Sequence, residues 1–174
     1  METRPKYIAF VASSIDGRIA KSGKSGTDWT SKEDWSFFTK SLKGMDAVIA
    51  GHNTYRVAKE RLKRRNTVVL TSKAAKLKIE GKTTFFNPEK SDIKKFLRIK
   101  KYKKIGILGG AKVYDFCLKN KMLDELFVTI EPYVFTTGVP MFSGKEFRKY
   151  KFILQSIKKL NKKGSLLLKY KNEN

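Results

Sequence analysis

A single carboxylate set among aromatic residues is the first feature of this sequence that could do chemistry. Asp34, Phe37, Phe38 and Ser41 are spaced i, i+3, i+4 and i+7, so they share one face of a predicted helix. Burying a carboxylate without partners is costly, and a flat amino-heterocycle offers two adjacent N–H donors that match its two oxygens. The ordinary alternative is an acid that faces water and stabilises the first helical turn.

Three predicted strand ends carry residues suited to phosphate groups. The first is Leu108-Gly109-Gly110-Ala111-Lys112, where glycines allow a close approach and the following helix start offers free N–H groups. The second, Ala50-Gly51-His52-Asn53-Thr54, repeats this order of strand, glycine and helix. The third, Leu70-Thr71-Ser72-Lys73, has two hydroxyls and an ammonium that suit a phosphate monoester, such as the 2′-phosphate that distinguishes NADP from NAD.

Each strand end also has an ordinary interpretation. Packing alone can explain the paired glycines, Asn53 or Thr54 can cap a helix, and residues 71–73 can form a polar turn. His52 can be a surface histidine rather than an anion ligand. Because open α/β sheets bind ligands beyond the carboxyl ends of their strands, three such ends favour a shared dinucleotide site over coincidence.

Composition and charge limit the classes of protein that the sequence can encode. The chain has 174 residues, so we expect a single globular domain over residues 1–174. Its net charge of +23 comes mostly from scattered lysines, which either form solvated surface or bind phosphates and glutamates. One cysteine, Cys117, and one histidine exclude an internal disulfide and a zinc site of the usual kind. No signal peptide or long apolar run is apparent, so we expect a cytoplasmic protein without a membrane span.

The order of the predicted elements is typical of the α/β class. Apolar strands alternate with helices up to about residue 120, which predicts a mainly parallel sheet, and the strand-rich last third predicts antiparallel strands at one edge. A capping box that pairs Thr30 with Glu33 is predicted to open the helix of Asp34. The predicted strands are residues 6–13, 46–50, 67–71, 82–86, 104–108, 126–135, 152–159 and 165–170, with a loop over 16–28 and a hairpin turn over 161–164.

Taken in chain order, these residues resemble dihydrofolate reductase and, more broadly, the fold that it shares with the reductase domain of riboflavin biosynthesis. The resemblance covers about Tyr7 to Tyr170, and its most specific motif is Trp29-x4-Asp34-x3-Phe38. Residues 48–54 and 107–114 are similar to the nucleotide-binding strand and the glycine-rich segment of that family. The resemblance implies a single-domain dihydrofolate-reductase-like fold: a central, mostly parallel twisted sheet of about eight strands with antiparallel C-terminal strands, flanked by about four helices.

The resemblance also implies roles for individual residues. The catalytic residues would be Asp34, which holds the pterin ring, Trp29, which closes the active-site loop, and Thr129, which hydrogen-bonds the acid. The residues expected to bind substrate are Ala12, Asp34, Phe38, Leu62, Thr129 and Arg65, the last at the position that grips the glutamate of folate. Those expected to bind NADPH are Ala12, Ile19, Gly51, His52, Asn53, Thr54, Thr71, Ser72, Lys73, Leu108, Gly109, Gly110, Ala111, Lys112, Val113 and Tyr114.

Two segments point instead to the riboflavin branch. Residues 14–20 and 132–142 resemble riboflavin reductases, which favours a pyrimidine that carries a ribityl or ribosyl phosphate. The chain also departs from dihydrofolate reductases: His52 stands where an arginine is common, and Asp28 stands where many relatives have proline. The loop over 21–27 lacks the usual apolar lid residue.

Three functions follow from these patterns. The main prediction is NADPH-dependent reduction of 7,8-dihydrofolate to 5,6,7,8-tetrahydrofolate. The alternative is a stand-alone pyrimidine reductase of the riboflavin type, acting on 5-amino-6-(5-phosphoribosylamino)uracil. The third is a basic nucleic-acid-binding protein. The sequence argues against it, because it has no RNA-binding aromatic signature and no recognition-helix pattern. We expect a small-molecule substrate and a monomer or homodimer.

Overall fold

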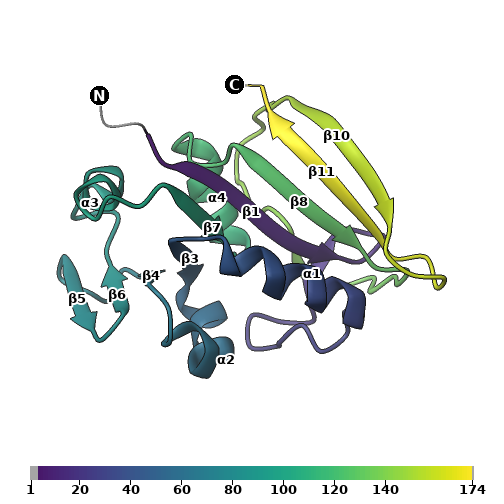
Figure 1. Ribbon diagram of the computed structural model, residues 1–174, viewed down its shortest axis with the longest axis horizontal. Helices are drawn as coiled ribbons and strands as arrows, with labels where there is room; N and C mark the ends of the chain where they lie inside the picture. Colours follow the sequence, from purple (N-terminus) through teal and green to yellow (C-terminus); the bar gives the residue numbers. More distant parts are fainter. Residues whose placement is uncertain (1–3, 174) are drawn as a thin grey trace.

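A nine-stranded sheet forms the frame of the computed structural model, which describes residues 4–173 (Figure 1). Its strands are β1 (Lys6–Ser13), β3 (Ala47–Gly51), β4 (Thr67–Leu70), β5 (Leu77–Glu80), β6 (Thr83–Phe86), β7 (Lys104–Ile107), β8 (Glu125–Ile130), β10 (Phe152–Lys159) and β11 (Leu166–Asn172). A second, two-stranded sheet pairs β2 (Arg18–Ala20) with β9 (Val139–Pro140). The helices are α1 (Lys32–Lys43), α2 (His52–Leu62), α3 (Ile93–Ile99) and α4 (Ala111–Lys119).

The strand order of the large sheet is β10-β11-β8-β1-β7-β3-β4-β6-β5. Neighbouring strands from β8 to β6 run parallel, whereas β11 and β10 pair antiparallel at one edge. The predicted α/β class, with a mostly parallel sheet, antiparallel C-terminal strands and four helices, is confirmed. The antiparallel strand β5 at the opposite edge was not predicted, because every residue of LKIE is exposed and gives no burial pattern.

Helices cover both faces of the sheet, and β1 shows how the sequence achieves this. Tyr7, Ala9 and Val11 belong to the core cluster beneath α3 and α4, whereas Ile8 and Phe10 belong to the cluster beneath α1 and α2. Alternate residues of a strand point to opposite faces, so a strand buried on both faces is a continuous apolar run. Figure 1 shows α1 in front of the sheet and α4 behind it. Cys117 on α4 is fully buried.

The cap of α1 differs from the predicted one by one residue. Ser31, not Thr30, is the N-cap, and its Oγ accepts a hydrogen bond from the backbone N–H of Asp34 at 3.2 Å. Glu33 does not close a capping box, because its carboxylate instead accepts a hydrogen bond from the amide of Asn161. The Thr30 hydroxyl, which is not a cap, donates to the carbonyl of Thr27 at 3.2 Å and also lowers the pKa of Asp34.

The predicted strand over 126–135 is wrong beyond Ile130. Pro132 has no N–H to donate to a neighbouring strand, and the N–H of Tyr133 turns back to the carbonyl of Glu131 at 2.8 Å. The N–H groups of Phe135 and Thr136 donate to the carboxylate of Asp16 rather than to a strand. The chain therefore leaves the large sheet at Ile130 and returns as β9, which pairs with β2 inside the predicted loop over 16–28.

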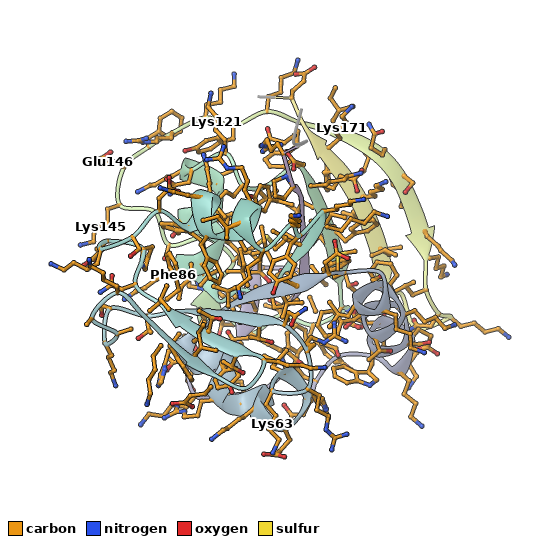
Figure 2. All side chains as sticks on the ribbon, turned by 60° about the vertical axis from the view of Figure 1, so that its left-hand side comes forward. Lys63, Phe86, Lys121, Lys145, Glu146 and Lys171 are labelled. Atoms are coloured by element: carbon orange, nitrogen blue, oxygen red, sulfur yellow. The ribbon has the colours of Figure 1, made fainter. Side chains whose placement is uncertain are left out.

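The positive charge is spread around the molecule. Figure 2 shows Lys63, Lys121, Lys145 and Lys171 projecting outward on different sides, whereas Phe86 lies inside. This distribution favours the interpretation of the lysines as solvated surface over a single binding face. Within residues 4–173, no helix is both long and apolar enough to cross a membrane.

Candidate active site

A cavity of about 740 Å³ lies between α1, α2 and the carboxyl ends of β1 and β8. Its lining includes every residue predicted to bind substrate: Ala12, Asp34, Phe38, Leu62, Arg65 and Thr129. Three further aromatic rings, Phe10, Phe37 and Phe127, line the same cavity, and the rings of Phe10 and Phe127 stack with centroids 5.5 Å apart. The cavity is thus an apolar, aromatic space with a few polar groups, which is the usual form of a small-molecule site.

Asp34 is the acid of this cavity and is only 8 % exposed. Burial raises the pKa of its carboxyl, and the nearby charge of Glu131 raises it further. Hydrogen bonds from the hydroxyls of Thr129 and Thr30 lower it, but burial prevails. Asp34 therefore takes up a proton at a higher pH than an exposed aspartate does.

The floor of the cavity comes from two adjacent strands. Ala12 on β1 and Thr129 on β8 are paired neighbours near the carboxyl ends of their strands. The small side chain of Ala12 leaves room above the floor, and the buried hydroxyl of Thr129 hydrogen-bonds Asp34. The predicted contact between Thr129 and the acid is therefore present.

Glu131 is a second buried acid that sequence reasoning missed. It is 2 % exposed, its Oε1 accepts the backbone N–H of Ser31 at 2.7 Å, and its Oε2 accepts the hydroxyl of Ser165 at 2.5 Å. Glu131 falls inside the segment predicted as one long strand, where an acid is expected to face water. Its only sequence signal is its place directly after β8 and directly before Pro132.

Trp29 does not line the cavity. Its ring packs edge-on against Phe135 with centroids 4.8 Å apart, and its buried Nε1 has no hydrogen-bond partner among residues 4–173. Small residues of the loop that follows β2 line the cavity instead, among them Gly23 and Gly26. These two glycines pack against Asn53 and Val57 of α2.

The two segments that resemble riboflavin reductases form one structural unit. Asp16 accepts hydrogen bonds from Ser14 Oγ and from the N–H groups of Phe135 and Thr136, and the Ser14 bond is the main reason that its pKa is lowered. A side chain at Gly138 would bring its Cβ within 2.5 Å of the carbonyl of Ala20, so this crossing requires glycine. Through β2 and β9 the unit presents Ile19, Ala20 and Val139 to the cavity.

The three strand ends predicted to bind the dinucleotide are adjacent, because β7, β3 and β4 are consecutive in the sheet. The cavity lining includes the predicted cofactor residues Ala12, Ile19, Asn53, Thr54, Leu108, Gly110 and Tyr114. The remaining predicted cofactor residues lie outside the lining: Gly51, His52, Thr71, Ser72, Lys73, Gly109, Ala111, Lys112 and Val113. They lie at or beside the carboxyl ends of β3, β4 and β7, with His52, Ser72, Lys73 and Lys112 exposed to solvent.

This edge fits the phosphates of a dinucleotide. The N-caps of α2 and α4 are Gly51 and Gly110, and neither helix start receives a side-chain hydrogen bond, in contrast to α1 and α3. The two starts are held together by a 2.7 Å bond from Gly51 N–H to the carbonyl of Gly109. A Cβ on Gly51 would lie 3.1 Å from the side chain of Val113, so the glycines keep the space between the helices open. Two uncapped helix starts side by side suit a pyrophosphate.

Tyr114 is fixed behind this edge. Its hydroxyl donates to the carbonyl of Phe10 at 2.6 Å, and burial raises the pKa of the phenol strongly. Tyr114 is therefore a permanent hydrogen-bond donor to the backbone of β1, and its ring supports Gly109.

The far end of the cavity carries two arginines. Arg65, which was predicted from the resemblance, donates from Nη1 to the carbonyl of Leu42 at 2.9 Å. Arg61, which sequence reasoning missed, stacks its guanidinium 4.5 Å from the ring centroid of Trp35. Both cations can meet an anionic tail of a ligand.

Comparison with known proteins places this site in a family. The model of the RibD C-terminal domain family matches residues 5–166. The uncharacterized protein YwjB of Bacillus subtilis is 28 % identical over 145 residues, which are 79 % of this chain and 82 % of YwjB.

Two solved structures share the fold at low sequence identity. A pyrimidine reductase-like protein of Corynebacterium diphtheriae has a TM-score of 0.77 and 19 % identity, covering 98 % of this chain and 92 % of that one. Dihydrofolate reductase of Enterococcus faecalis, solved in complex with NADP(H), has a TM-score of 0.68 and 21 % identity and covers the full length of both chains. The predicted resemblance to the fold shared by dihydrofolate reductases and riboflavin reductases is confirmed.

Proposed function

This chain belongs to the RibD C-terminal domain family and is a reductase, and we propose that it uses NADPH to reduce a pyrimidine of the 5-amino-6-(5-phosphoribosylamino)uracil type. The observation that carries the proposal is the buried carboxyl of Asp34, which lies in an aromatic cavity that reaches Thr54 and Gly110 at the starts of α2 and α4. The family match and the two segments that build the β2–β9 unit favour this substrate over dihydrofolate, the substrate that we first predicted from the sequence.

The residues of this chain account for substrate orientation. The carboxyl of Asp34 would take the amino edge of the ring, and the hydroxyls of Thr129 and Thr30 keep its oxygens pointed into the cavity. The rings of Phe37 and Phe127, whose centroids are 5.3 Å apart, would give the heterocycle an apolar wall to pack against. Binding in one orientation next to the cofactor is most of what such a reaction requires.

NADPH, when bound, would supply the hydride. In the pyrimidine candidate the sugar ring first opens to its imine form, and the carbon of that C=N bond accepts the hydride. Gly51 and Gly110 would hold its pyrophosphate at the starts of α2 and α4, and Ser72 with Lys73 would hold its 2′-phosphate. The nitrogen of the C=N bond needs a proton, and Asp34, with its raised pKa, can hold that proton near the ring for delivery through water. Ile19, Ala20 and Val139 would cover the reacting carbon and limit access of solvent.

Dihydrofolate is the second candidate substrate. The hydrogen bond between Thr129 and Asp34, together with Arg65 at the far end of the cavity, favours a pterin with a glutamate tail. The same arginines can hold the ribosyl phosphate of the pyrimidine, so the cavity accommodates either anion.

Oxidation of NADPH, followed by its absorbance, distinguishes the candidates when each substrate is offered in turn. The proposal expects turnover with the ribosylamino-pyrimidine, and its loss in Asp34→Asn. Turnover with dihydrofolate alone would make the chain a dihydrofolate reductase, and turnover with neither substrate would refute both candidates. Glu125→Gln, which removes an acid at the opposite end of β8, is the control and should behave like the unaltered protein.

A further inference from the structure

Glu131 is a fully buried acid to which the proposed reaction gives no role. It is 2 % exposed and does not line the cavity, so it cannot contact a substrate there. No lysine or arginine bonds it within residues 4–173; its partners are the backbone N–H of Ser31 at 2.7 Å and the hydroxyl of Ser165 at 2.5 Å. Burying a carboxylate in this way is costly, so its retention calls for a specific use.

The partners of Glu131 connect two distant parts of the chain. On one side, Ser31 is the N-cap of α1, and its Oγ binds the N–H of Asp34 at 3.2 Å. On the other side, Ser165 directly precedes β11 of the C-terminal hairpin and receives a hydrogen bond from the amide of Asn161 at 2.9 Å. Glu131 therefore joins the first turn of α1 to the turn between β10 and β11.

The position of Asp34 depends on this connection. Its backbone N–H is bound by the residue that Glu131 holds, while its carboxyl receives the hydroxyl of Thr129, which lies on β8 two residues before Glu131. Contacts with residues at the end of β8 therefore hold both the backbone and the side chain of Asp34 in place. A displacement of Ser31 would move the carboxyl relative to the cavity floor.

The charge of Glu131 also affects the pKa of Asp34. The other charged groups that face the cavity are Asp28 and Lys32 near the start of α1, and Arg61 and Arg65 from α2 and the turn after it. Of all these groups, Glu131 is the one whose charge acts on the pKa of Asp34, raising it after burial has done so.

We propose that Glu131 is a positioning residue for Asp34: it fixes the first turn of α1 to the ends of β8 and the C-terminal hairpin, and keeps a second negative charge behind the cavity carboxyl. Its catalytic consequence rests on the proposed reductase function. Its structural and electrostatic consequence does not, and can be measured in the protein without substrate.

The test compares Glu131→Gln with Glu125→Gln by NMR titration of the Asp34 carboxyl carbon in the full chain. Glutamine keeps the shape and the acceptor oxygen for Ser31 but removes the charge. The midpoint of the Asp34 titration should move to lower pH in Glu131→Gln and stay unchanged in Glu125→Gln. An unchanged or higher midpoint in a folded Glu131→Gln protein would overturn the electrostatic part of the proposal.

A second variant, Ser165→Ala, tests the positioning part without altering any charge and serves if Glu131→Gln does not fold. It removes the hydroxyl that holds Oε2, so the amide signal of Ser31 and the carboxyl signal of Asp34 should both shift although Ser165 is outside the cavity. If neither signal moves, the hairpin does not position Asp34 and the proposal fails.

Turnover supplies the catalytic arm. In Glu131→Gln we expect kcat to fall about tenfold near neutral pH, as small misplacements of catalytic groups do, while KM changes less than about twofold. The loss of activity on raising the pH should begin at lower pH, because Asp34 loses its proton sooner. If no candidate substrate is turned over by the unaltered protein, the proposed function fails, but the NMR results still decide the role of Glu131.

Discussion

The two ends of the candidate site are built in opposite ways. Around Asp34, the acids and Thr129 are buried and hydrogen-bonded: Thr129 bonds the carboxyl, and Glu131 bonds the N-cap of the helix. Along the strand ends proposed to hold the cofactor, the side chains of Ser72 and Lys73 are exposed, and within residues 4–173 no side chain caps the starts of α2 and α4. One end is complete without a ligand, and the other is completed by one.

This difference follows from the chemistry that each end would perform. Recognition of a ring edge and storage of a proton depend on one carboxyl at one place, so identity and position both matter. Phosphates are recognised by backbone N–H groups and by flexible cations, which tolerate exchange of individual side chains. Substitutions should therefore be most damaging at the buried end and progressively milder toward the exposed edge.

Replacement of Asp34 by Asn is expected to have the largest effect. At neutral pH, kcat should fall on the order of 100-fold or more, because an amide cannot hold the proton or accept two N–H donors. NADPH binding, measured by fluorescence or calorimetry, should stay unchanged because Asp34 is not among the residues proposed to hold the phosphates of the cofactor.

Glu33→Gln is the matched control for this variant. It removes the neighbouring acid of the same helical turn, whose side chain points to Asn161 rather than into the cavity. Activity equal to that of the unaltered protein is expected. Unchanged turnover in Asp34→Asn itself would remove Asp34 from the mechanism.

The contrast between the two ends also explains what the sequence could reveal. Asp34 and its aromatic neighbours were predictable because helical spacing places them on one face, and the glycines at residues 51 and 109–110 were predictable because they punctuate strands and helices. Glu131 was not, because its burial is produced by Ser31 and Ser165, which lie 100 and 34 residues away from it along the chain.

The strands of the sheet show the same difference: limits set by the local sequence were predictable, and limits set by residues far along the chain were not. Strands buried on both faces, such as β1 and β3, are continuous apolar runs and were found with nearly correct limits. The end of β8 was missed because it is set by Asp16, which captures the N–H groups of Phe135 and Thr136 from across the structure. Arg61 was missed because its stacking partner, Trp35, belongs to another helix.

Gly109→Ala tests whether the cofactor edge has any position as strict as Asp34. Gly109 has a φ of +84°, and a Cβ there would lie 2.6 Å from the ring of Tyr114. We expect a loss of about 2 kcal/mol in the free energy of unfolding, measured with denaturant, together with weaker NADPH binding.

Gly81→Ala separates the two causes of this loss. Gly81 has a φ of +58° but no atom within 4 Å of its added Cβ, so it carries the backbone cost without the collision. Its loss of stability should be smaller. Equal losses of stability in the two variants would mean that the ring of Tyr114 moves aside for the added Cβ. The strand ends would then tolerate substitution better than the buried end at every position tested.

Ser72 and Lys73 should show the mildest effect on function. In the double variant Ser72→Ala, Lys73→Ala, we expect KM for NADPH to rise about tenfold, equivalent to about 1.4 kcal/mol, because a charged hydrogen bond and a hydroxyl contact to the 2′-phosphate are lost. KM for NADH, which lacks that phosphate, should not change. Lys158→Ala on β10 controls for the lower net charge, and an equal rise for both cofactors would place the 2′-phosphate elsewhere.

The smallest expected effect is a gain in stability, rather than a loss, in Asp34→Asn. Because the pKa of Asp34 is raised in the folded protein, the stability that this residue contributes is present at low pH and is lost as pH rises from the unfolded value of 3.8 through the folded value. At neutral pH, Asp34→Asn should therefore raise Tm, by about 2–4 °C if the gain is near 1 kcal/mol, and the difference should disappear toward pH 3. Thermal melts of both proteins across this range measure it. An equal or lower Tm for Asp34→Asn at neutral pH would mean that Thr129 and Thr30 offset the burial completely, and the buried end would then be built for stability rather than for chemistry.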